Sequence, residues 1–173
     1  TSDDNGDTWT PRHEGLPATA RIESILESST GRAFLAATDG LFWRDNGDSA
    51  WTEATEGLSA TNKRTYGLAQ LPSGRLLASP SFTVYHSDDD GATWTEADPQ
   101  ARLSFAYSMG VAPNGDIIAP TFYRGVFRST DGGETWERVL YKSDKAGAID
   151  IIIDESNPRI LYASIYEVIR TFW

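Results

Sequence analysis

Short apolar runs alternate with clusters of turn-forming residues along the whole chain. The runs are rich in Val, Ile, Leu, Phe and Tyr and are bounded by Gly, Pro, Asn, Asp and Ser, which is typical of β-strands joined by tight turns. We expect apolar strand residues to pack neighbouring sheets together, among them Phe34, Leu41, Leu68, Leu77, Val111, Ile118, Ile151 and Leu161. The predicted strands form sets of four, the last incomplete: 22–26, 32–37, 41–44 and 51–54; 65–71, 75–79, 83–87 and 93–97; 106–112, 116–120, 125–129 and 135–139; and 149–153, 159–164 and 167–171.

One eight-residue segment, Ser-x-Asp-x-Gly-x-Thr-Trp, recurs at residues 2–9, 87–94 and 129–136. A degenerate copy lies at residues 45–51. The tryptophans that close the four copies are Trp9, Trp51, Trp94 and Trp136, so the repeat has a period of 42 or 43 residues. A fixed period of this size indicates a repeat architecture in which each repeat is one supersecondary unit.

The segment has the composition of a self-contained turn. Its Gly supplies a positive-φ position, and its Asp carboxylate accepts hydrogen bonds from turn amides that would otherwise lack partners. Ser and Thr hydroxyls add similar bonds, and the Trp ring covers the hairpin. Residues 88–91 resemble a calcium loop but lack the Glu that closes an EF-hand, so we predict no metal site. We assign a structural role to Asp4, Gly6, Trp9, Asp45, Gly47, Trp51, Asp89, Gly91, Trp94, Asp131, Gly133 and Trp136.

The repeated segment resembles the Asp-box, or BNR repeat, of sialidases, sortilin-type domains, xyloglucanase-type glycoside hydrolases and photosystem assembly factors. The resemblance implies an all-β fold, a β-propeller of four-stranded antiparallel blades. Residues 151–158 and 161–163 also resemble the strands that precede the box in sortilin-like and xyloglucanase-like bacterial propellers. The motif occurs in enzymes and in non-enzymes, so it indicates an architecture and leaves the activity open.

Residues 1–173 are expected to form a single propeller domain or a propeller fragment. The repeat places a blade remnant at residues 1–10, blades at 21–55, 64–97 and 105–140, and an incomplete blade at 147–173. Three assemblies are open at this point. Residues 1–10 could complete the last blade and close a four-bladed ring, two chains could exchange ends in an eight-bladed dimer, or the chain could be part of a larger propeller.

Charge narrows the range of partners. The chain has 25 acidic and 15 basic side chains, a formal net charge of −10 and no Cys. This charge argues against nucleic acid and anionic membranes as partners. No apolar run approaches the ~20 residues of a membrane-spanning helix. We predict no cofactor, and the resemblance implies an extracellular or cell-envelope location for what we expect is a mature piece or a fragment.

The resemblance implies that a ligand binds at the turns between second and third strands and at the links between blades. These are residues 39–40, 80–82, 121–124 and 164–167. Alignment of the repeats also places Glu23, Tyr66, Tyr107 and Asp150 at one position of the innermost strands. Aromatic faces stack on sugar rings, and carboxylates bind hydroxyls or transfer protons. We therefore predict ligand-binding residues at Tyr66, Tyr107, Phe82, Tyr123, Arg124 and Tyr166.

Two functions follow from these residues. The first is a non-catalytic binding or scaffold module for a glycan or protein partner. The alternative is part of a sialidase-like or xyloglucanase-like glycoside hydrolase, in which Glu23 and Asp150 would be the two carboxyl groups that flank the scissile bond. Neither Arg-Ile pair in the chain is followed by Pro, so the sequence lacks the Arg-Ile-Pro signature of sialidases.

Overall fold

The computed structural model describes residues 1–173 except 3, 60–62, 104, 144, 155–159 and 168–173. Every regular element in these residues is a β-strand. The first sheet contains β1 (Ile22–Glu27), β2 (Ala33–Ala37), β3 (Gly40–Arg44) and β4 (Thr52–Glu53). The second contains β5 (Thr65–Gln70), β6 (Leu76–Pro80), β7 (Tyr85–Ser87) and β8 (Thr95–Glu96). The third contains β9 (Gly110–Val111), β10 (Ile117–Thr121), β11 (Gly125–Ser129) and β12 (Glu137–Leu140), and a last pair contains β13 (Ala146–Ile153) and β14 (Leu161–Glu167).

Each four-stranded sheet is an antiparallel meander in which neighbours in sequence are neighbours in space. This is the all-β propeller-blade arrangement that the repeat predicts, and most strands begin and end within two residues of their predicted bounds. Strand 106–112 is shorter than predicted, because only Gly110–Val111 pairs continuously while Ala106 forms an isolated bridge to Thr121. The predicted turn at 164–167 is wrong, since β14 continues to Glu167. Most of the predicted strand 167–171 lies outside the described residues.

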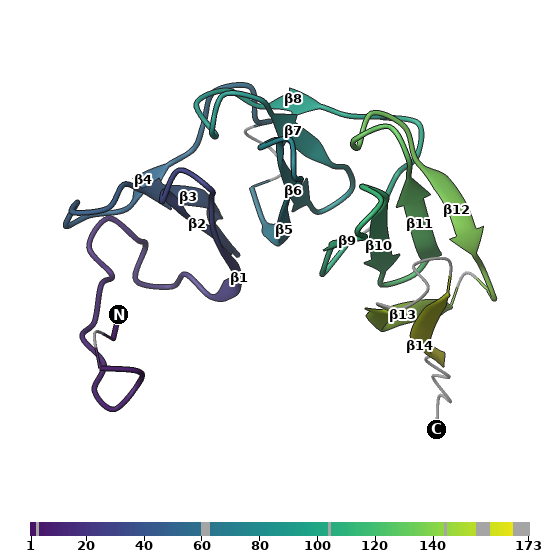
Figure 1. Ribbon diagram of the computed structural model, residues 1–173, viewed down its shortest axis with the longest axis horizontal. Helices are drawn as coiled ribbons and strands as arrows, with labels where there is room; N and C mark the ends of the chain where they lie inside the picture. Colours follow the sequence, from purple (N-terminus) through teal and green to yellow (C-terminus); the bar gives the residue numbers. More distant parts are fainter. Residues whose placement is uncertain (3, 60–62, 104, 144, 155–159, 168–173) are drawn as a thin grey trace.

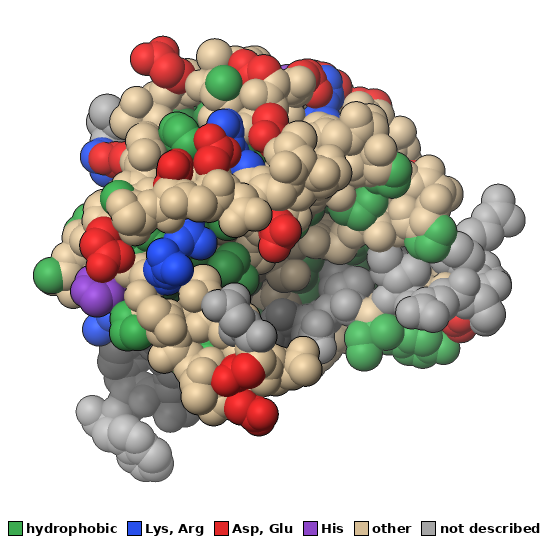
Figure 2. Space-filling view, turned by 60° about the vertical axis from the view of Figure 1, so that its left-hand side comes forward, with side chains coloured by type: hydrophobic (Ala, Val, Ile, Leu, Met, Phe, Trp, Pro, Cys, Tyr) green, Lys and Arg blue, Asp and Glu red, His purple; other side chains and the backbone are tan. Residues whose placement is uncertain are grey.

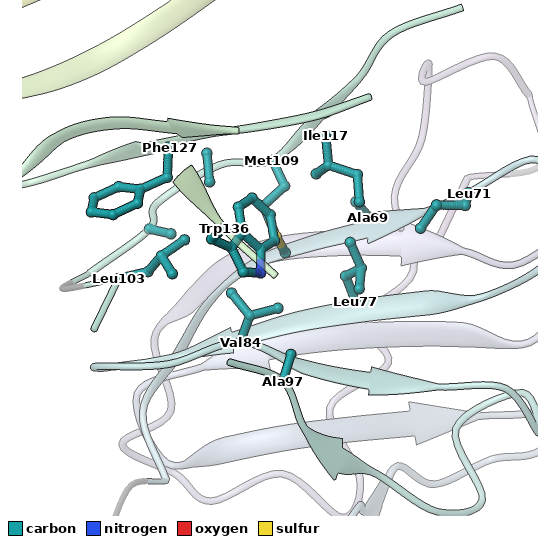
Figure 3. Packing of buried hydrophobic residues seen from close by; sticks show 12 residues of the cluster. Ala69, Leu71, Leu77, Val84, Ala97, Leu103, Met109, Ile117, Phe127 and Trp136 are labelled. Atoms are coloured by element: carbon teal, nitrogen blue, oxygen red, sulfur yellow. The ribbon is translucent and has the colours of Figure 1, made fainter. Parts of the chain in front are cut away.

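The hydrophobic core lies between neighbouring sheets. Phe34 and Leu41 of the first sheet pack with Leu68, Leu76 and Trp94 of the second. The next junction has the same organisation, and Figure 3 shows Leu77 and Val84 of the second sheet facing Met109, Ile117 and Trp136. Most of the predicted core residues are buried, namely Phe34, Leu41, Leu68, Leu77 and Ile118. Val111 is half-buried, and the structure does not describe the side chains of Ile151 and Leu161.

A Gly of each buried box lies directly on the second strand of the preceding sheet. A Cβ atom on Gly91 would be 2.5 Å from the Phe34 ring, and one on Gly133 would be 2.9 Å from Leu77. The Phe34 ring also meets Trp94 edge-on, with 6.4 Å between ring centroids. These glycines therefore serve close packing between blades as well as the positive φ of the turn.

The link that follows a box closes over the next one. The backbone N–H of Trp51 donates to the carbonyl of Glu14 at 2.8 Å, and that of Trp94 donates to Glu56 at 3.0 Å. A Cβ atom on Gly15 or Gly57 would lie 2.1 or 1.8 Å from the carbonyl oxygen of the same tryptophan. The two Glu-Gly-Leu links thus share one geometry, and Gly is required because the two backbones are in contact.

The sheets follow one another along an open arc (Figure 1), with residues 1–10 at one end and β13 and β14 at the other. In the described part of the chain no backbone hydrogen bond joins residues 1–10 to β13 or β14, and Thr10 pairs with Thr1. The four-bladed ring closed by these residues is therefore not formed in this structure. An open arc of blades is the shape expected of part of a larger propeller.

Candidate ligand-binding face

One end of the sheets carries a cluster of aromatic side chains, which we call the aromatic platform. At this end second strands turn into third strands, and the chain enters each new sheet from the previous one. The platform combines residues from β5, from the β6–β7 and β10–β11 turns, from the segment before β9 and from β14. Its members are Tyr66, Phe82, Phe105, Tyr107, Phe122, Tyr123 and Tyr166.

Phe105 and Tyr66 join the second sheet to the third. The Tyr66 ring centroid lies 5.5 Å from Phe105 and 4.9 Å from Tyr107, both edge-on. Phe105 also contacts Phe82 at 5.0 Å and Tyr123 at 6.2 Å. Edge-to-face pairs at these separations are favourable beyond the apolar area that they bury. The rings are thereby fixed by one another.

Phe122 continues the platform toward β14. Its ring centroid lies 4.3 Å from Tyr123, 5.6 Å from Tyr107 and 5.3 Å from Tyr166. The hydroxyl of Tyr166 also donates to the Phe122 carbonyl at 3.3 Å. Ring contacts therefore run without interruption from the second sheet to β14.

The backbone of Phe105 is unusual. Its φ is 54°, in the left-handed region that residues other than Gly rarely adopt. The Phe105 N–H donates to the carbonyl of Ser81 at 2.7 Å, and its carbonyl accepts from the N–H of Phe122 at 3.2 Å. Hydrogen bonds to both neighbouring turns thus hold the ring at the centre of the platform.

The platform is partly open to solvent. Phe82, Tyr107 and Tyr123 are 51%, 37% and 41% exposed, whereas Tyr66 beneath them is only 3% exposed. Burial raises the pKa of Tyr66 and Tyr107 above the ordinary value, and it raises the pKa of Tyr166 to about 12. All three phenols therefore stay neutral at physiological pH and can donate hydrogen bonds.

An ion pair borders the platform on the side of the first sheet. Arg64 Nη2 lies 2.6 Å from Glu23 Oε1, and the Arg64 guanidinium lies 4.8 Å from the centroid of the Tyr66 ring. The hydrogen bond to Glu23 raises the pKa of Arg64. The predicted catalytic residue Glu23 is thus held by a cation of the next blade, an interaction that the sequence analysis missed.

The second predicted catalytic residue, Asp150, has a side chain outside the described part of the structure. Its backbone pairs with Ser164, with a register shift between Ala148 and Asp150. The corresponding shifts in the first two sheets fall at Glu23 and Tyr66. Backbone register therefore makes Ile149 the counterpart of these residues, which differs by one position from the sequence alignment. Because the side chain of Asp150 is not described, the predicted pairing of the Glu23 and Asp150 carboxyl groups stays a prediction.

Five of the six predicted ligand-binding residues are members of the platform, and the sixth, Arg124, is next to it. Arg124 Nη1 donates to the carbonyl of Arg102 at 3.1 Å, in the segment that leads to Phe105. The prediction omitted Phe105 and Phe122. Phe122 lies in a turn that the sequence marked, and Phe105 follows a segment without any strand pattern.

The Asp-boxes at residues 45–51, 87–94 and 129–136 lie at the turns between third and fourth strands, away from the platform. In residues 87–94, Asp89 accepts hydrogen bonds from the Ser87 hydroxyl and from both the N–H and the hydroxyl of Thr93. Gly91 N–H donates to Ser87 Oγ, and the Trp94 indole donates to the Gly91 carbonyl. The same bonds occur in residues 2–9 and 129–136.

The degenerate copy is arranged differently. Asp45 accepts two hydrogen bonds from Arg32, at 2.7 and 3.1 Å, and the Trp51 indole donates to the carbonyl of Arg12. Gly47 keeps the positive φ of the other boxes, 98°. The turn therefore keeps a positive-φ glycine. Its Arg32–Asp45 pair is not specific to this copy, because Arg75 pairs with Asp88 in the same way, at 2.7 and 2.8 Å, beside the intact box.

Acidic side chains are spread over the face seen in Figure 2, with fewer basic ones between them. Among the residues described, no three His, Cys, Asp or Glu side chains are placed to hold a metal ion. The same residues contain no helix long and apolar enough to cross a membrane.

Comparisons with known proteins agree with the repeat and the sheets. Residues 127–138 match the model of the BNR/Asp-box repeat family. The chain is 26% identical over 183 residues to a protein of Neosartorya fischeri named as a probable oligoxyloglucan-reducing end-specific xyloglucanase. This match covers 95% of the chain and 22% of the relative, so the chain spans about a fifth of the relative's length.

Solved structures show the same fold. An ancestral GH74 enzyme superposes with a TM-score of 0.68 at 17% identity, over 90% of this chain and 23% of that one. The extracellular domain of a one-component system of B. thetaiotaomicron superposes with a TM-score of 0.58 at 11% identity, over 70% of this chain and 17% of that one. The chain is thus an Asp-box β-propeller chain that resembles glycoside hydrolase propellers.

Proposed function

We propose that this chain is a non-catalytic binding module that holds a glycan on the aromatic platform. The continuous ring network from Tyr66 to Tyr166 carries the proposal, because it presents exposed ring faces on a fixed support. Aromatic faces stack on the apolar faces of sugar rings, and neutral tyrosine hydroxyls bind sugar hydroxyls at the edges. Similarity to a xyloglucanase and to a GH74 enzyme supports a carbohydrate over a protein ligand.

The test is isothermal titration of the chain with cello-, xylogluco- and galacturono-oligosaccharides. Phe82→Ala and Tyr123→Ala each remove an exposed ring of the platform, and we expect about tenfold weaker binding, which corresponds to ~1.4 kcal/mol. Trp9→Ala is the matched control, because Trp9 is more exposed than either residue but belongs to a box. Absence of binding to every oligosaccharide, or an equal loss in the control, would contradict the proposal.

The second candidate function is that this chain forms part of a glycoside hydrolase. The name of the Neosartorya fischeri relative supports it. Hydrolysis needs two carboxyl groups about 5–10 Å apart, one on each side of the scissile bond. Glu23 is the only predicted candidate whose side chain is described, and it pairs with Arg64. We expect the chain to release no reducing ends from xyloglucan oligosaccharides. Release that disappears in Glu23→Gln would favour the hydrolase.

We also propose an extracellular or cell-envelope location. The support is the likeness to an extracellular domain of a bacterial sensor and to enzymes of glycan breakdown. Polymeric glycans are encountered outside the cell membrane, where a platform of this kind would meet them. Protease accessibility of the protein in intact cells of its source tests this location.

A further inference from the structure

Some cationic side chains at the platform end form ion pairs with carboxylates and one does not, and this difference helps to indicate the charge of the ligand. Arg64 lies 2.6 Å from Glu23, and Lys63 lies 2.7 Å from Glu53. Each of these two cations is neutralised by a carboxylate of the first sheet. The chain as a whole carries a formal charge of −10, so such pairs offer little net attraction to an anionic ligand.

Arg124 is positioned without being neutralised. Its guanidinium donates to the Arg102 carbonyl at 3.1 Å, and its backbone N–H donates to the Thr121 hydroxyl at 3.1 Å. It forms no ion pair with any residue that the structure describes. A carbonyl fixes the planar guanidinium but leaves its positive charge and its other N–H donors available. A planar fork of this kind matches a carboxylate through two parallel hydrogen bonds.

The position of Arg124 places this charge beside the platform. It follows Tyr123 directly in the β10–β11 turn, and the carbonyl that holds it belongs to the segment leading to Phe105. The rings of Tyr123 and Phe105 are themselves in contact at 6.2 Å. A sugar ring stacked on Tyr123 would therefore bring its substituents within reach of the Arg124 guanidinium.

We propose that Arg124 receives the carboxylate of an acidic sugar, so that the preferred ligands of the platform are glycans that contain uronic acid residues. This inference rests on the proposed glycan-binding function and specifies its ligand class. The aromatic rings supply affinity for the sugar ring, and Arg124 discriminates between a carboxylate and a neutral group. Its single charge acts at short range, since the ligand must come close in spite of the net negative charge of the protein.

The test compares an oligogalacturonate with its methyl ester, two ligands with the same backbone that differ in charge. At an ionic strength of about 0.15 M, which screens the net negative charge of the protein beyond ~8 Å, we expect the acid to bind at least about tenfold more tightly than the ester, as one bidentate charge-assisted pair provides. In Arg124→Gln the two ligands should bind with affinities within about twofold of each other. Arg12→Gln is the matched control, because it makes the same charge change at an exposed residue of the first link.

Three outcomes decide between the proposals. Tighter binding of the acid that Arg124→Gln abolishes and Arg12→Gln retains supports the assignment of Arg124. Equal binding of acid and ester, or a preference that survives in Arg124→Gln, overturns that assignment. In that case, binding of neutral cello- or xylogluco-oligosaccharides that Tyr123→Ala weakens leaves the glycan-binding function standing, and absence of any glycan binding overturns both proposals.

Discussion

The same motif occurs in two contexts in this molecule. Residues 2–9 and residues 87–94 form the same five hydrogen bonds within the box. Yet Trp9 is 73% exposed and Trp94 is 3% exposed. The box is therefore a local structure that folds the same way with or without a neighbour, and its contribution to the core depends on the blade that precedes it.

The preceding blade contacts the buried box at several points. Phe34 packs against Trp94, the Glu56 carbonyl accepts from the Trp94 N–H, and the Arg32 guanidinium donates to the Asp90 carbonyl at 2.9 Å. Arg75 repeats the last contact at the next junction, where it donates to the Gly132 carbonyl at 3.2 Å. The described residues provide no such partners for the box at residues 2–9. Comparing substitutions in the two boxes separates the motif from the junction.

The largest difference is expected at the tryptophans. Trp94→Ala removes a buried ring at the junction of two sheets, and we expect the free energy of unfolding to fall by about 3–5 kcal/mol. Trp9→Ala removes an exposed ring, and we expect a change within about 0.5 kcal/mol. Urea unfolding at constant m-value measures both. If Trp94→Ala does not express as folded protein, Trp94→Phe should show an intermediate loss. Equal effects of Trp94→Ala and Trp9→Ala would contradict the comparison.

A smaller difference is expected at the glycines. Gly91 and Gly6 both have positive φ, 79° and 94°, so alanine strains either turn by about 1 kcal/mol. At Gly91 the new methyl group would also displace the Phe34 ring, while at Gly6 it meets only Trp9 at 3.8 Å. We therefore expect a loss of about 2–3 kcal/mol for Gly91→Ala and no more than about 1 kcal/mol for Gly6→Ala. In the double variant Gly91→Ala with Phe34→Ala, the added clash should disappear.

The sequence predicts the box and the blade well because both are local. The partners of Asp89 lie within four residues of it, so a short motif specifies the whole network. The alternating strands are likewise bounded by turns that can be recognised from their Gly, Pro and Asn residues. Within the described residues, the architecture therefore follows from the repeat with few errors.

The candidate site is less predictable because it joins residues far apart in the sequence. Phe105 reaches the platform through a left-handed backbone and a hydrogen bond to Ser81, and neither leaves a pattern in the sequence. Glu23 and Arg64 are 41 residues apart, and only the packing of two blades brings them together. The alignment of Asp150 with Tyr66 failed because the register shift in β13 falls at the residue before it. Register shifts of this kind redirect side chains without changing the strand pattern.

The smallest expected difference between the two boxes is in how the free energy of unfolding depends on acid pH. Hydrogen bonds from the Thr93 hydroxyl and N–H lower the pKa of Asp89 from 3.8 to about 2, and Thr8 does the same for Asp4. The hydrogen bonds that lower this pKa in the folded state stabilise the protein above pH 3.8, where the carboxylate is ionised. Their contribution is lost as the pH falls toward 2. Asp89 is exposed, so solvent screens its charge. We therefore expect the loss of stability in acid to be smaller than the losses in Trp94→Ala and Gly91→Ala.

Asparagine at either position tests the coupling between box and core. We expect Asp89→Asn to be less stable than the parent protein at pH 7, and the difference in urea midpoint to shrink as pH falls from 4 toward 2, where the parent carboxylate is protonated too. Asp4→Asn should follow the parent curve throughout, because residues 2–9 can open without disturbing the buried junctions. A pH-dependent difference of equal size for Asp4→Asn would show that the first box is as firmly coupled to the core as the second.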